Sequence, residues 1–179
     1  AAGVAEFTTD LMQQEYWDGS NETLLDNLAK AIEKVIVDGL TMGDIASSLS
    51  ETVFDGEITE RRAEMIARSE TTGAMNAGQH TARETLVEEG IIESKEWFST
   101  FDQRTRDSHA DADGQRKDND EEFELSSGEK CLYPGAANLS PAERCNCRCI
   151  AVAVTAFSDS TAFRESIKKH LPTCLVHSK

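Results

Sequence analysis

Residues 59–90 read TERRAEMIARSETTGAMNAGQHTARETLVEEG, and this stretch decides the fold. Small residues recur along it at steps of three and four, so they share one face of a helix. They are Ala63, Ala67, Thr71, Ala74 and Gly78. A stripe of small side chains lets another backbone approach closely. We therefore predict one long helix over residues 59–89 that stops at Gly90.

Two glycines inside this stretch leave two interpretations open. Gly73 and Gly78 each cost about 1 kcal/mol of helix propensity relative to alanine. Either close packing against another segment requires them, or the helix is broken near Gly73.

The sequence before this stretch predicts a helical hairpin. Apolar residues recur at three- and four-residue steps over residues 21–37, and Gly39 ends that pattern. Thr41 and Asp44 then form a capping-type start for a second, shorter helix. The apolar positions of this second helix are Ile45, Leu49 and Val53.

The pattern after Gly90 favours strands. Residues 96–101 are aromatic and β-favouring, and residues 149–154 form a strongly apolar strand candidate. Residues 102–138 between them are polar and rich in loops. The chain is therefore predicted to be α+β, with a helical N-terminal half, a long central helix and then a small mixed β-rich module.

The chain is predicted to have three parts. Residues 1–58 form a helical arm or hairpin, residues 59–157 form the module that includes the long helix, and residues 158–179 form a tail with a short helix near residues 163–169. The sequence begins at Ala1 without a methionine, so it is expected to be a trimmed or mature piece of a longer protein.

The charge balance disfavours a broad nucleic-acid surface. Acidic residues outnumber basic ones by 33 to 18, which gives a net charge of -15 and a pI near 4.6. Such a surface repels phosphate on average, although a local patch of Arg61, Arg62 and Arg68 is an alternative for a weak DNA contact. No window approaches the roughly 18 apolar residues of a membrane span, and no signal segment is visible. We expect a soluble protein without membrane contact.

Cysteines suggest either buried thiols or metal ligands. Five are present, and three of them crowd into residues 145–149. His109 with Cys147 and Cys149, joined by Cys131 or Cys145, offers the imidazole and thiolate ligands of a tetrahedral Zn²⁺. On a strand these three crowded cysteines would share one face, with Ile150, Val152 and Val154 on the other. Structural thiols in the core and a disulfide are the alternatives, and a reducing compartment is expected.

Two further site hypotheses concern the polar loop. Asp111, Asp113 and Asp120 partly match a calcium-binding loop, against the simpler interpretation of a solvated acidic loop. Arg104, Arg106 and His109, the last oriented by Asp102, are an alternative nuclease-like or transferase site. The chain contains no glycine-rich phosphate loop, G-x-S-x-G or H-E-x-x-H motif, so no catalytic residues are assigned.

Three blocks in the second half of the chain stand in a definite order. They are IARSET with NAG at residues 66–71 and 76–78, then Trp97 followed by DQRTRDSH at residues 102–109 and DGQ at residues 113–115, and finally NCRC at residues 146–149. Together they resemble the Mu F-like minor head proteins of bacteriophages, over residues 41–157. Ser69 replaces the threonine usual in that family, and Cys131 and Cys145 are additional to its pattern.

The resemblance implies a structural protein and not an enzyme. Members of this family act in head morphogenesis, so the expected partners are the portal protein and capsid or scaffold proteins. The expected location is the host cytoplasm during assembly and then the capsid interior or portal vertex, as an oligomer in the virion. The resemblance also favours structural ion pairs among a set of charged residues that would tie the helical half to the β-rich half. The set is Arg68, Glu70, Arg104, Arg106 and Arg148.

Overall fold

The computed structural model describes residues 27, 30–34, 37–53, 60–100, 102–155 and 165. Of the first predicted helix, the described residues up to Val37 are helical. The start of that helix and the predicted C-terminal helix, apart from Glu165, lie outside the described residues. The division of the chain into three parts stays a prediction.

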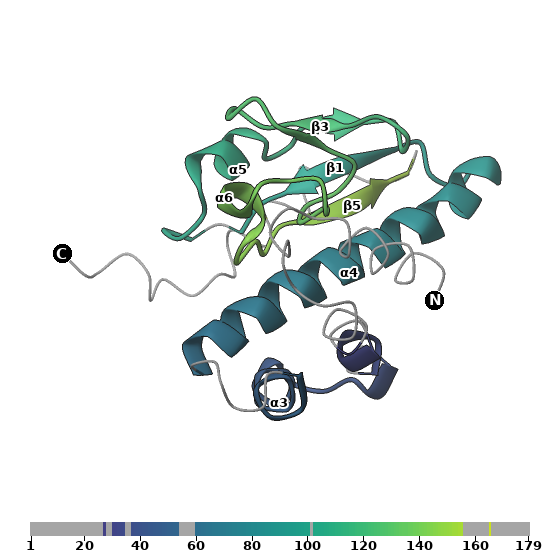
Figure 1. The fold of residues 1–179 in the computed structure, drawn as a ribbon. Coiled ribbons are helices and arrows are strands. Elements are labelled where there is room, and N and C mark those ends of the chain that lie inside the picture. Colours follow the sequence, from purple (N-terminus) through teal and green to yellow (C-terminus); the bar gives the residue numbers. More distant parts are fainter. Residues whose placement is uncertain are drawn as a thin grey trace.

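A single long helix separates two layers (Figure 1). This helix, α4, spans Glu60–Glu88 without a break, which confirms the prediction for residues 59–89. On one side lies α3 (Met42–Ser48), which continues as a π-helical turn over Leu49–Val53. The strands and two short helices lie on the other side. Neither α4 nor any other helix that the structure describes is long and apolar enough to span a membrane.

The helical layer is held by apolar packing and a local cap. Ile32, Ile45 and Leu49 are fully buried in the same core as Ile66 of α4. Thr41 caps α3, since its Oγ1 accepts from the backbone N–H of Asp44 at 3.3 Å while the Asp44 carboxylate accepts from the backbone N–H of Thr41 at 3.1 Å. The predicted capping start is therefore confirmed.

Another backbone lies against α4 at Gly73. A Cβ placed on Gly135 would lie 3.3 Å from the Cα of Gly73, which is tighter than ordinary van der Waals contact. Gly135 also has a φ of +77°, a conformation that favours glycine. Of the two interpretations left open by the sequence, close packing is confirmed and a break near Gly73 is wrong.

The main sheet has three antiparallel strands in the order β2-β1-β5. β1 spans Ser94–Phe98, two residues earlier than its predicted start, β2 spans Arg116–Lys117 and β5 spans Ile150–Val154. In the pairing of β1 with β5, Trp97 lies opposite Ala151. Because β1 has a neighbour on each edge, it forms the middle of the module, and its residues from Lys95 to Phe98 are all buried.

The segment predicted to be polar loop also contains short elements. These are α5 (Asp107–Asp111), a hairpin of β3 (Phe123–Glu124) and β4 (Lys130–Cys131), and α6 (Pro141–Arg144). Buried Lys95 fastens this segment to β1, since its Nζ donates to the carbonyls of Asn119 at 2.7 Å and Leu132 at 2.9 Å. Burial lowers the pKa of Lys95 to about 8, and nearby Arg83 acts in the same direction.

The prediction that cysteines 145–149 lie on one strand face is wrong. Cys145 ends α6, Asn146 has a φ of +57°, and β5 begins only at Ile150. The left-handed residue turns the chain, so the side chains of this segment do not alternate as on a strand. Within β5 itself, Ile150 is 41% exposed, whereas Ala151 is buried.

Candidate functional site

Three of the predicted metal ligands meet inside the module. His109 lies on α5, while Cys147 and Cys149 lie on the segment between α6 and β5. The His109 Nδ1 is 3.8 Å from the Cys147 Sγ and 3.4 Å from the Cys149 Sγ. All three side chains are buried. The other two suggested ligands, Cys131 and Cys145, are not part of this group.

Two neighbours hold the imidazole of His109 in place. The ring of Trp97 meets it edge-on with a centroid separation of 5.4 Å. On the opposite nitrogen, Nε2 lies 3.0 Å from a carboxylate oxygen of Glu143. Burial acts to raise the pKa of Glu143, but hydrogen bonds from Ser108 and Ser127 and the nearby charges outweigh it and lower that pKa. An ionised Glu143 favours an N–H at Nε2 and leaves the Nδ1 lone pair facing the thiols.

Among the described residues, Cys131 and Cys145 lie outside this group. Cys131 is fully buried in the β3–β4 hairpin, and its burial raises the pKa of its thiol to about 12. Within the group, a hydrogen bond from Cys149 lowers the pKa of Cys147, although burial acts against this.

The predicted ion-pair residues are brought to one region, but with different partners. Glu70 pairs with Arg144, not with the loop that carries Arg104 and Arg106. Both members of this pair are nearly inaccessible, with 2% and 4% of their side chains exposed. Burial raises the pKa of Glu70 to about 7, although the charge and the hydrogen bond of Arg144 act to lower it. This pair ties α4 to α6.

The remaining arginines bind loops and backbone. Arg148 donates to both carboxylate oxygens of Asp102, one of them at 2.8 Å, and this hydrogen bonding lowers the pKa of Asp102 well below its usual range. The hypothesis of a nuclease-like or transferase site required Asp102 to orient His109, but Asp102 instead binds Arg148. Arg68 donates to the side chain of Asn146 at 3.0 Å, and Arg106 donates to the carbonyl of Cys145.

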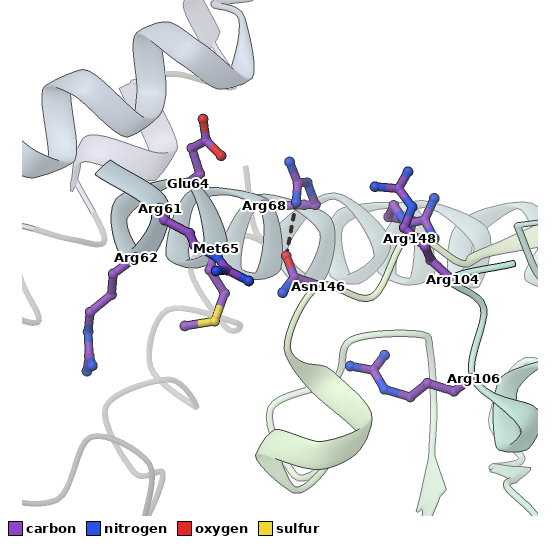
Figure 2. Close-up of a pocket in the computed structure, with 9 residues that line it drawn as sticks. All are labelled: Arg61, Arg62, Glu64, Met65, Arg68, Arg104, Arg106, Asn146 and Arg148. Atoms are coloured by element: carbon purple, nitrogen blue, oxygen red, sulfur yellow. Dashed lines mark hydrogen bonds between the residues drawn. The ribbon is translucent and has the colours of Figure 1, made fainter. Parts of the chain in front are cut away.

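Six arginines line one open groove between α4 and the module (Figure 2). Its volume is about 750 Å³, and Glu64, Met65 and Asn146 complete its lining. From α4 come Arg61, Arg62 and Arg68, and from the module come Arg104, Arg106 and Arg148. The sequence indicated a patch of three arginines on one helix, and the groove contains these three and three more from the module.

Several residues of this region were missed by sequence reasoning. No role was predicted for Arg144 or Glu143 from the sequence, and nothing local marks them as buried. Asn76 was noted within a motif but given no role, yet its amide donates to the carbonyls of Pro134 and Cys149, each at 3.0 Å. No local pattern in the sequence reveals these contacts, because the partners lie more than 30 positions away in the chain.

The calcium-loop hypothesis gains no geometric support. Among the described residues, Asp111, Asp113 and Asp120 do not form a group with converging ligand atoms. Asp113 instead accepts from the backbone N–H of Ser99 at 2.8 Å.

Comparison with known proteins places this arrangement in a family. Residues 27–152 match the family described as Phage Mu protein F like protein. The chain belongs to this family. The resemblance noted from the ordered blocks of residues is thereby confirmed, and so is a role related to the phage head.

Two curated relatives match the Mu F-like part of the chain. One is the NAD(+)--arginine ADP-ribosyltransferase EFV of Enterococcus faecalis, 30% identical over 130 residues, which are 72% of this chain and 26% of that protein. The other is a Haemophilus influenzae protein named only as an uncharacterized protein, 32% identical over 130 residues, which are 73% of this chain and 25% of that protein. The chain thus spans about a quarter of the length of the relatives it matches. No solved structure matches the chain.

Proposed function

We propose that this chain is a structural head-morphogenesis protein that binds portal and capsid components during virion assembly. The observation that carries the proposal is the family match over residues 27–152, which spans both the helical layer and the β-rich module. The protein would assemble in the host cytoplasm and remain in the capsid interior or at the portal vertex.

The helical layer offers the surface for a portal or capsid subunit. Val37 is 77% exposed and Leu40 is 42% exposed. Both precede α3, which lies on the side of α4 away from the sheet (Figure 1). Exposed apolar side chains next to a helical pair are a common anchor of protein interfaces, because their burial on binding is favourable.

The test is co-expression of the tagged chain with the portal and major capsid proteins of the phage or prophage that encodes it. We expect the portal or capsid protein to copurify, and Val37→Asp with Leu40→Asp to reduce its recovery at least tenfold. The matched control is Val87→Asp with Ile91→Asp, another exposed apolar pair, with 36% and 51% exposure, in the last turn of α4 and just after it. If neither viral protein copurifies with the wild-type chain, the proposal fails. If both double variants reduce the recovery equally, the surface around Val37 and Leu40 is not the binding site, but the proposed function still stands.

The geometry supports catalysis by Arg104, Arg106 and His109 less well than recognition. His109 is 2% exposed between two thiols and a carboxylate, and Arg106 donates to a backbone carbonyl. ADP-ribosyl transfer is named only for a relative of which this chain matches about a quarter. Divalent-metal-dependent nuclease activity that His109→Ala abolishes would favour the enzymatic alternative.

A further inference from the structure

The ligand atoms of His109, Cys147 and Cys149 have the spacing of a tetrahedral zinc site. Zinc lies about 2.3 Å from thiolate sulfur and about 2.0 Å from imidazole nitrogen, so a sulfur and a nitrogen ligand lie roughly 3.5 Å apart. The two measured separations from the His109 Nδ1 are 3.8 Å and 3.4 Å. All three ligand atoms lie within 4.8 Å of one another.

The second observation is the carboxylate behind His109. Histidines that bind zinc generally donate their other ring N–H to a carboxylate or carbonyl, which fixes the tautomer and the ring orientation. Glu143 occupies this place, with its Oε2 3.0 Å from His109 Nε2. Ser108 in turn donates to the same oxygen of Glu143 at 2.8 Å. The contact to Nε2 has the length but not the alignment of a hydrogen bond, and a small turn of the ring would align it.

A small cavity lies against the cluster. Its volume is about 10 Å³, and His109, Cys147 and Cys149 are among its lining residues. A cavity of that size holds about one water-sized body. Thr100, Thr105 and Arg106 line the same cavity, so a solvent molecule can reach the fourth position of a metal from this side.

We propose that His109, Cys147 and Cys149 bind one Zn²⁺ ion, with Glu143 as the positioning residue behind the histidine. Binding replaces the two thiol protons, which pass to solvent, and transfers no electrons. Two sulfurs and one imidazole nitrogen suit zinc and not the oxygen-seeking ions Mg²⁺ and Ca²⁺. The ion would join α5 to the segment between α6 and β5, which is not part of a helix or strand.

The first test measures metal content in the reduced, full-length protein after loading with zinc and removal of excess. We expect about one zinc per chain, and replacement by Co²⁺ should give the visible spectrum of tetrahedral cobalt with a thiolate charge-transfer band. A strong chelator should lower the Tm by roughly 10 °C, because the metal stabilises only the folded state.

Variants separate a metal site from general packing. Cys147→Ser and Cys149→Ser should each lose stoichiometric zinc, whereas Cys145→Ser, the same change in the same segment, should retain it. Glu143→Gln should weaken zinc affinity about 10- to 100-fold while leaving the three ligands in place. This variant keeps the test decisive if a cysteine variant fails to fold.

Several outcomes would overturn the zinc proposal. They are a wild-type protein without stoichiometric metal and with an unchanged melt, equal zinc loss in Cys145→Ser and Cys149→Ser, and a mass that shows a disulfide in place of two free thiols. A zinc affinity unchanged by Glu143→Gln would remove the role assigned to Glu143.

A separate observation concerns the arginine groove. Six arginines line it in a chain whose net charge is -15. Among the residues that line the groove, Glu64 contributes a carboxylate, and Arg148 and Arg104 contact the carboxylate of Asp102. The groove is therefore locally cationic, and Arg104 keeps 77% of its side chain exposed.

We also propose that this groove binds the phosphodiester backbone of double-stranded DNA, weakly and without sequence preference. Guanidinium groups bind phosphate oxygens through paired hydrogen bonds. Duplex DNA carries one charge per about 1.7 Å of its axis, about twice the density that an extended acidic peptide can reach, since a residue spans about 3.3 Å. Duplex DNA, as the more highly charged of the two ligands, is therefore attracted more strongly to the arginine groove than an acidic peptide is. The acidic remainder of the protein repels DNA and keeps the affinity low.

The test is fluorescence anisotropy of a labelled DNA duplex at low salt. Arg61→Gln with Arg62→Gln should weaken binding at least fivefold and reduce the dependence of log affinity on log salt by about one to two units. The control is Lys34→Gln with Lys130→Gln, which removes two exposed cations elsewhere. The proposal fails if the wild type binds no DNA or if both double variants lose the same amount of DNA affinity. It also fails if polyglutamate displaces the labelled duplex as well as unlabelled DNA does.

Discussion

The two sides of α4 are held by different kinds of interaction. On the helical side, Ile32, Ile45 and Leu49 bury apolar side chains, and the cap at Thr41 involves residues three apart in the chain. On the module side, Glu70 and Asn76 make buried polar contacts with residues more than 50 positions away. The helical side follows from local sequence, whereas the module side depends on contacts that form only once the chain has folded back.

The difference also predicts how each side responds to substitution. In apolar packing, the loss of unfolding free energy increases gradually with the side-chain volume removed. In a buried polar contact, a single substitution costs much more free energy, because removing one partner leaves the other buried without solvent or a hydrogen bond. We therefore expect the largest effects of single substitutions on the module side of α4.

The Glu70–Arg144 pair should show the largest effect. Replacing Arg144 with alanine leaves a carboxylate that is 2% exposed without its counter-charge, so the free energy of unfolding should fall by about 3–5 kcal/mol. Urea denaturation monitored by circular dichroism measures this change.

A double variant serves as the control for this pair. Glu70→Leu with Arg144→Met removes both charges and keeps apolar volume, and it should recover most of the lost stability. If Arg144→Ala costs less than about 1 kcal/mol, the pair does not hold α4 to α6.

The close approach of Gly135 to Gly73 should give the next largest effect. Gly135→Ala adds a Cβ at 3.3 Å from Gly73 and strains a φ of +77°, so we expect a loss of about 2–3 kcal/mol. Gly128 is the matched control, because its φ is +94° but a Cβ there would meet nothing within 4 Å. Gly128→Ala should cost about 1 kcal/mol. Equal losses in thermal melts of the two variants would show that the close approach contributes nothing.

His80 should make stability depend on acid pH. Burial lowers the pKa of His80 to about 4, and the nearby charges of Lys95 and Arg83 act in the same direction. The unfolded state therefore binds a proton at higher pH than the folded state does. The stabilisation is complete above about pH 6.5 and is lost as the pH falls toward 4, with a total near 2 kcal/mol after allowance for solvent screening.

The variant His80→Phe isolates this contribution of a single group. The difference in unfolding free energy between wild type and variant should change across pH 4–6.5 and stay constant from pH 7 to 8. A constant difference throughout would mean that His80 takes up its proton equally in both states.

The cap of α3 should show the smallest effect. Thr41→Ala removes the side-chain oxygen that accepts from Asp44 and should cost about 1 kcal/mol, whereas Thr41→Ser should be nearly neutral. Hydrogen exchange of the α3 amides would localise the change. Faster exchange in the sheet as well would show that the two layers unfold as one unit.

Most of the helical architecture could be predicted from the sequence. Periodicity placed α4 within one residue at each end, and the pairing of Thr41 with Asp44 located the start of α3. The strand β5 was also visible as an apolar run. The faces of the segment before it were predicted wrongly, because one left-handed residue, Asn146, turns the chain and cannot be recognised from alternation alone.

The candidate site was predictable in its composition and not in its contacts. The sequence singled out His109, Cys147 and Cys149 because few side chains bind soft metals, and the structure brings these three together. It did not indicate Glu143 behind the histidine or Arg144 as the partner of Glu70. Such partners depend on the path of the loop between β4 and α6, where short elements of two to four residues carry no periodic signal.

The order of strands β2-β1-β5 determines when the protein can finish folding during synthesis. β1 lies at the centre of its sheet, but one of its neighbours is translated more than 50 residues later. At ribosomal elongation rates the nascent chain therefore spends seconds with α4 complete and its module face uncovered. Glu70, Asn76 and Arg83 lie on that face and are hydrated during this interval. The same polar residues that fix the native contacts thus keep the half-made chain from associating with its neighbours on the polysome.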